Sequence, residues 1–154
     1  MRKSAGIVLY RLNNNYLEVF LVHPGGPYWQ GKEEGAWSIP KGEFTDGEDP
    51  LTTAKREFKE ETSFTIEGQF IDLGQVQQKS GKLVLAWAVE GDIEASKIKS
   101  NTFRQEWPYK SGKWHSFPEV DKGAWFSFSD AQIHINPAQF TFLERLVTLL
   151  KKET

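Results

Sequence analysis

Residues Gly42 to Phe64 read GEFTDGEDPLTTAKREFKEETSF and contain the strongest structural signals in the chain. Asp49 followed by Pro50 predicts a helix start, because an aspartate oxygen can accept from free backbone N–H groups and proline is preformed for the first helical position. The helix is predicted to span residues 50–62. Its start determines which of the following side chains share a face.

Three glutamates of this helix, Glu57, Glu60 and Glu61, stand at i, i+3 and i+4 and therefore share one face. Like charges at this spacing repel by roughly a few tenths of a kcal/mol per pair. A bound divalent cation would turn that repulsion into attraction. Because the stretch offers oxygen ligands and no Cys or His, it favours magnesium or manganese over zinc. A solvated, charge-rich helix is the competing interpretation, but it does not explain why like charges cluster.

The order of residues around these glutamates resembles the signature of the Nudix hydrolases. The matching positions are Gly42, Glu48, Arg56-Glu57, Phe58, Glu60-Glu61, Thr62 and Phe64. Ser63 stands where the family has glycine. This departure concerns the turn after the helix, because a left-handed C-cap costs serine roughly 1 kcal/mol more than glycine.

The resemblance implies a metal-dependent hydrolase of diphosphate linkages that uses Mg²⁺, with Mn²⁺ as an alternative. Glu57 and Glu61 would be direct metal ligands, together with the main-chain carbonyl of Lys41. Glu60 would be a ligand or would support one. The general base could also lie within the signature, at Glu57 or Glu60.

Other catalytic roles follow from the same resemblance. Arg56 would orient the carboxylates, with Glu48 as its partner or as a water-mediated contributor; a plain surface ion pair is the alternative for Arg56. A carboxylate outside the signature often supplies the base in this family, and Glu119 and Glu106 are the candidates. Glu119 is preferred, since its spacing to Trp125 resembles that of diadenosine polyphosphate hydrolases.

The substrate prediction rests on Lys41 and on an aromatic pair. Pro40-Lys41-Gly42 resembles diadenosine and inositol polyphosphate hydrolases, and a lysine beside the metal would attract phosphates that the metal does not reach. The alternative is that its side chain points to water. Tyr28 and Trp29 lie in a polar loop, where stacking on a base and simple packing are both open. Together these residues favour a dinucleoside polyphosphate.

Outside the signature, strand-forming and helix-forming segments alternate along the chain. Strands are predicted at Ala5–Leu12, Leu17–His23, Trp37–Pro40, Gln69–Gln78, Leu83–Glu90 and Ala124–Phe128. Residues 91–101 and 107–116 are predicted as loops, the first with a short helical piece. Asn136-Pro137 predicts the start of a terminal helix. This order is typical of an α+β domain, and the resemblance implies a Nudix-type α/β/α sandwich with a central mixed sheet and a C-terminal helix.

Composition limits the function classes. The chain has 154 residues, a net charge of −2 and no cysteine. We therefore expect one domain over residues 1–154, no general nucleic-acid binding, no membrane span and a cytoplasmic location. The missing cysteine also argues against a prenyl diphosphate isomerase of the same fold. A nucleoside triphosphate pyrophosphohydrolase and a non-hydrolytic nucleotide-binding regulatory domain remain alternatives, and the oligomeric state stays open.

Overall fold

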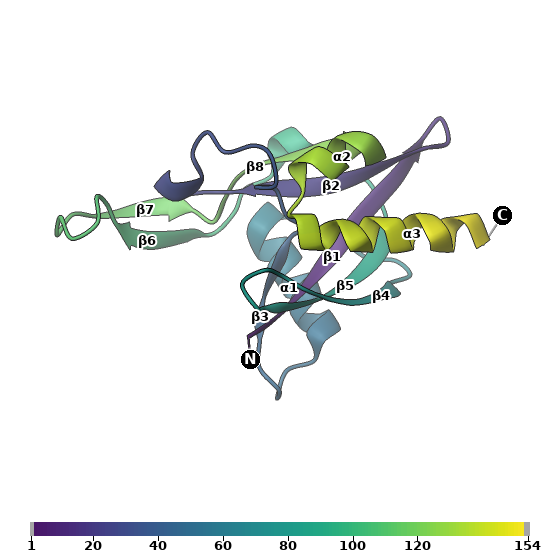
Figure 1. The fold of residues 1–154 in the computed structure, drawn as a ribbon, viewed down its shortest axis with the longest axis horizontal. Helices are drawn as coiled ribbons and strands as arrows, with labels where there is room; N and C mark the ends of the chain where they lie inside the picture. The colour runs from purple at the N-terminus through teal and green to yellow at the C-terminus, as the bar shows by residue number, and fades with distance from the viewer. Residues whose placement is uncertain (1, 153–154) are drawn as a thin grey trace.

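The computed structural model describes residues 2–152 and has a mixed sheet of six strands (Figure 1). The strands are β1 (Lys3–Asn13), β2 (Tyr16–Pro24), β3 (Lys41–Phe44), β4 (Ile71–Gln77), β5 (Leu83–Glu90) and β8 (Val120–Ser127). They lie in the order β4-β5-β1-β2-β8, and β3 also pairs with β1. The β1–β5 pair is parallel, whereas β1 runs antiparallel to β2 and β3. The predicted mixed sheet is confirmed.

Helices cover both faces of this sheet. They are α1 (Pro50–Thr62), α2 (Phe128–His134) and α3 (Phe140–Lys152). Successive residues of β1 point to opposite faces, as a strand requires. Ile7 packs in one buried cluster with Phe58 of α1, while Val8 packs in the other with Leu143 and Leu146 of α3. The two cores make the α/β/α sandwich that the sequence predicted.

The helix α1 has the predicted bounds and the predicted cap. The backbone N–H of Thr52 donates to Asp49 Oδ2 at 2.9 Å. Ser63 caps the end of the helix and takes the left-handed conformation with φ 71°. Its hydroxyl donates to the carbonyl of Lys99, so serine gains a tertiary contact at the position where glycine would be unstrained.

The strand predicted at Trp37–Pro40 is wrong. Trp37 and Ser38 form only isolated bridges, with Ile135 and Val22, and the strand β3 starts one residue after Pro40. Proline has no N–H for a ladder, and its carbonyl instead accepts from the N–H of Ile7 at 3.1 Å. The chain thus enters β3 at Lys41, one residue before the signature begins.

Residues 102–118 form a two-stranded arm: residues 107–113 are its turn, as predicted, whereas residues 114–116, also predicted as loop, lie in a strand. The arm pairs β6 (Thr102–Glu106) with β7 (Trp114–Pro118), and Figure 1 shows it projecting from the sheet. Most of its residues are exposed on both faces. Neither strand therefore shows the apolar alternation from which a strand is predicted.

The predicted helix start at Asn136-Pro137 opens with a short 3₁₀ turn, Pro137–Gln139, before α3 begins at Phe140. Asn136 Oδ1 accepts from the N–H of Ala138 at 3.0 Å and caps this turn. Among residues 2–152, no helix is long and apolar enough to cross a membrane.

Candidate active site

The glutamates of α1 lie against the start of β3. A Cβ atom on Gly42 would overlap the carboxyl group of Glu57, so glycine is what allows this carboxylate to approach the backbone. The backbone of Lys41 donates a hydrogen bond to Glu61. The helix and the first residues of β3, Lys41 and Gly42, thereby form one side of a small acidic site.

Burial and mutual repulsion disfavour the ionised form of these carboxyl groups. Burial, followed by the charge of Glu60, raises the pKa of Glu57 to about 7. Burial also raises the pKa of Glu61 to about 8, with Lys41 opposing the rise and the charges of Glu57 and Glu119 adding to it. Near neutral pH these groups either retain protons or need a cation beside them.

Arg56 lies among three glutamates. Its guanidinium is 3.7 Å from Glu48, 3.7 Å from Glu57 and 3.8 Å from Glu60. Glu48 also closes the loop before the helix, because its Oε1 accepts from the backbone N–H of Thr45 at 2.9 Å. The hydrogen bonds from the backbone and side chain of Thr45 lower the pKa of Glu48 more than the charge of Arg56 does. Arg56 is thus placed where it could orient two of the site glutamates.

Glu119 is joined to the helix through the backbone of Asn101. The N–H of Glu119 donates to the carbonyl of Asn101 at 2.8 Å, and the N–H of Asn101 donates to the carbonyl of Glu60 at 2.9 Å. Burial and the charge of Glu60 raise the pKa of Glu119. Glu106 instead accepts from backbone N–H groups of Lys110 and Gly112 in the arm turn. Of the two candidates, the structure brings Glu119 beside the signature glutamates.

The donor set fits a hard divalent cation in its chemistry. It consists of carboxylate and carbonyl oxygens, the ligands that Mg²⁺ and Mn²⁺ prefer, and Gly42 leaves the space that Glu57 needs. Within residues 2–152, however, no three Asp, Glu, His or Cys side chains are arranged as a complete metal site. Glu57 and Glu61 are neighbours with raised pKa values, and the metal-binding role of Lys41, Glu57, Glu60 and Glu61 stays a prediction.

A cavity of about 360 Å³ opens beside Lys41, and Trp29, Trp37 and Lys79 also line it. Burial lowers the pKa of Lys41, and the nearby charge of Lys82 lowers it further. Lys41 is thus partly buried and lines this cavity. Lys79 and Lys82 lie between the strands predicted at Gln69–Gln78 and Leu83–Glu90, and the two lysines that flank Ser-Gly there were the available signal.

The two aromatic residues of the substrate prediction differ in exposure, although their ring centroids lie only 5.1 Å apart in an edge-to-face contact. Trp29 lines the cavity, whereas the Tyr28 side chain is 59% exposed. The Lys32 Nζ lies 3.6 Å from the centre of the Tyr28 ring, a cation–π contact. The face of Tyr28 opposite Lys32 is therefore open to a base, and Trp29 offers its surface to the cavity.

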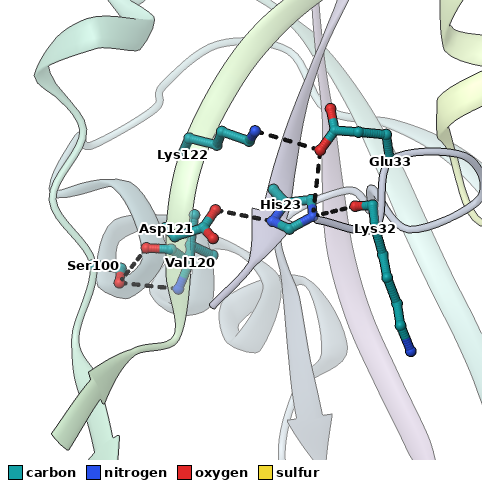
Figure 2. A network of polar contacts seen from close by, with 7 residues as sticks. All are labelled: His23, Lys32, Glu33, Ser100, Val120, Asp121 and Lys122. Carbon is teal, nitrogen blue, oxygen red and sulfur yellow. Dashed lines mark hydrogen bonds and ion pairs between the residues drawn. The ribbon is translucent and has the colours of Figure 1, made fainter. Parts of the chain in front are cut away.

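His23 fixes the loop that contains these aromatics (Figure 2). Its Nδ1 is 2.9 Å from Asp121 Oδ1, and its Nε2 is 2.6 Å from the carbonyl of Lys32. Both partners offer acceptor oxygens to the ring nitrogens of His23. Glu33, 3.8 Å from Nε2, also accepts from Lys122 at 3.4 Å. The buried His23 ring thus ties residues 32–33 to β8.

Comparisons with known proteins agree with this architecture. The family model for the NUDIX domain matches residues 1–146. No curated protein matches the chain in sequence. The crystal structure of an Ap4A hydrolase from C. elegans, in a binary complex, has a TM-score of 0.69 and 22% identity, and the match covers 99% of both chains.

A second similar structure is the NUDIX domain of Shewanella oneidensis NrtR complexed with ADP ribose. It has a TM-score of 0.62 and 16% identity, and the match covers 99% of this chain and 88% of that one. At such identities these likenesses show the fold. The match to the family model is what shows that the chain belongs to the NUDIX family, and its enzyme class is that of hydrolases acting on phosphorus-containing acid anhydrides.

Proposed function

We propose that this protein is a divalent-metal-dependent hydrolase of dinucleoside polyphosphates. The observation that supports this most directly is the group of neighbouring glutamates Glu57, Glu61 and Glu119. Within it, Glu61 accepts from the backbone of Lys41, and Lys41 lines a cavity together with Trp29. An acidic site can hold a cation that neutralises phosphate oxygens, while the lysine and the aromatic ring suit a phosphate and a base.

Each residue has a role in this proposal. Glu57, Glu61 and the carbonyl of Lys41 hold Mg²⁺ or Mn²⁺, and Glu60 supports them. When bound, the metal supplies positive charge to the phosphate oxygens and favours ionisation of water. Glu119 accepts a proton from the water that attacks phosphorus, since its raised pKa makes it a better base than an ordinary glutamate.

The polyphosphate chain would extend from the metal toward the lysines. Lys41 and Lys79 line the cavity, and Lys82 lies close enough to Lys41 to lower its pKa. Such a group of cations is unfavourable in isolation and becomes favourable next to several phosphates. A long polyphosphate satisfies more of these charges than a single diphosphate does.

Two other substrates and one other role compete with this proposal. A nucleoside triphosphate offers the same phosphates with one base, and the ADP ribose in the similar Shewanella structure is a nucleoside diphosphate linked to another group. A non-hydrolytic nucleotide-binding domain would use the cavity without the acidic site. The group of raised-pKa glutamates favours hydrolysis over simple binding.

The test is a substrate panel: diadenosine tetraphosphate, ATP and ADP ribose, each with Mg²⁺ and with Mn²⁺. We expect metal-dependent turnover with the highest kcat/KM on diadenosine tetraphosphate. Glu57→Gln and Glu61→Gln should each lower kcat by more than about a hundredfold, because the charge is lost and the shape is kept. Glu67→Gln, at an exposed position beyond the helix, is the control. Wild-type turnover in both site variants would refute the metal assignment.

A further inference from the structure

The arm carries a concentration of aromatic side chains that the sandwich does not bury. They are Phe103, Trp107, Tyr109, Trp114 and Phe117, with His115 among them. None of these residues belongs to either buried cluster of the described chain. The aromatic rings therefore contribute little to the core that holds the domain together.

Strand pairing divides these residues between the two faces of the arm. Phe103 pairs with Phe117, and Gln105 pairs with His115, so these four side chains share one face. The ring centroids of Phe103 and Phe117 are 6.0 Å apart, and those of His115 and Phe117 are 6.1 Å apart. We call this group, Phe103, His115 and Phe117, the aromatic face.

The opposite face has a different character. Arg104 and Ser116 are paired there, as are Glu106 and Trp114. The Arg104 guanidinium lies 5.9 Å from the Trp114 ring, which is 56% exposed. Residues on this opposite face, which belong to the same two strands, can therefore serve as controls for the aromatic face.

The aromatic face is the one that lies toward the candidate active site. A Cβ on Gly26 would be 2.9 Å from Phe103 Cζ and 3.7 Å from Gln105 Oε1. The loop that begins at Gly26 continues to Trp29, which lines the cavity beside Lys41. Figure 1 shows this loop alongside β7.

The acidic site also adjoins the base of the arm. Phe117 precedes Glu119 by two residues, so their Cα atoms are at most about 7 Å apart. The N–H of Gly25 donates to the carbonyl of Glu119 at 2.9 Å, which fixes this junction. A substrate whose phosphates lie at the glutamates therefore has the cavity on one side and the aromatic face on another.

We propose that the aromatic face of the arm binds the second nucleoside of a dinucleoside substrate by stacking on its base. The first nucleoside occupies the cavity at Trp29. Aromatic side chains on a strand surface stack on any base, because every base has a π face. Arm charges favour an anion as well, since Arg104, Lys110 and Lys113 outnumber Glu106. This inference rests on the proposed function and identifies residues that select two-base substrates.

The experiment compares two substrates with the same number of phosphates, diadenosine tetraphosphate and adenosine tetraphosphate. They differ in the second nucleoside. Phe103→Leu keeps an apolar side chain against Gly26 but removes the ring, and His115→Ala removes an exposed ring. We expect each variant to raise KM for diadenosine tetraphosphate by about fivefold or more, with kcat and the kinetics of adenosine tetraphosphate unchanged. Trp114→Ala, on the opposite face, is the matched control.

Three results would overturn the proposal. They are unchanged KM for the two-base substrate, equal changes for both substrates, and an equal effect of Trp114→Ala. A wild-type protein that turns over neither nucleotide would refute the proposed hydrolysis instead. In that case, calorimetry with the same two nucleotides on wild type and on Phe103→Leu decides the inference. The variant must bind the two-base nucleotide more weakly and the one-base nucleotide with unchanged affinity.

Discussion

Gly42 and Glu57 are in contact in a way that no other residue at position 42 would permit, because a Cβ there would overlap the Glu57 carboxyl group. We predict that Gly42→Ala displaces this carboxylate and lowers kcat/KM by about a hundredfold. The far end of a glutamate can move, so the melting temperature should change little. Gly47→Ala, in the turn that follows β3, places its Cβ in open space and is the control. Equal kinetics for the two variants would show that Glu57 need not lie there.

Metal-free protein should become less stable as the pH rises. The carboxyl groups of Glu57 and Glu61 have an ordinary pKa of 4.5 and folded-state values of about 7 and about 8. Between these values the folded protein binds more protons than the unfolded chain, so raising the pH favours unfolding. The stabilising effect is full below about pH 4.5 and lost above about pH 8.

This pH dependence can be measured by thermal melting in EDTA at about pH 5.5 and about pH 8.5. We expect a lower melting temperature at the higher pH, by at least about 3 °C. Millimolar Mg²⁺ should restore much of the loss, since the cation replaces the protons. Glu61→Gln should reduce the difference and Glu67→Gln should not. A melting temperature that rises over this range would contradict the prediction.

Local chemistry explains what the sequence could predict. The helix α1 was predictable because its cap, its proline and its glutamate spacing are all short-range signals. Asp49 caps the helix as expected, by accepting from the N–H of Thr52. The strands β1, β2, β4 and β5 were predictable because buried faces require apolar residues. The strand predicted at residues 37–40 was wrong, because a single hydrogen bond from Ile7 to Pro40 replaces ladder pairing there.

Long-range contacts explain what the sequence could not predict. Glu119 was preferred to Glu106 only for its spacing to Trp125. The contact that places Glu119 at the helix is the long-range bridge through Asn101. Lys82 approaches Lys41 because β5 and β3 both flank the first residues of β1. The arm escaped prediction because neither of its faces is buried in the core. Such features follow from the assembled sheet, not from any one segment.

Glu119 should affect the rate more than binding. We expect Glu119→Gln to lower kcat by about a hundredfold or more while KM changes less than threefold or so, because the amide keeps the shape but cannot accept a proton. Glu106→Gln is the comparison, since Glu106 holds the arm turn through Lys110 and Gly112. It should alter stability slightly and leave kcat unchanged. If both variants keep the wild-type rate, Glu57 or Glu60 is the next candidate for the base.

Lys41 should determine the preference for long polyphosphates. It lines the cavity together with Lys79, while its backbone contacts Glu61. Lys41→Met keeps the length and the backbone but removes the charge, so the metal site should survive. We expect kcat/KM for diadenosine tetraphosphate to fall by about tenfold and that for ADP ribose to fall less, because fewer phosphates contact the lost charge. Lys59→Met, exposed on α1, controls for the change in net charge. An unchanged ratio of the two efficiencies would show that the lysine contributes its carbonyl alone.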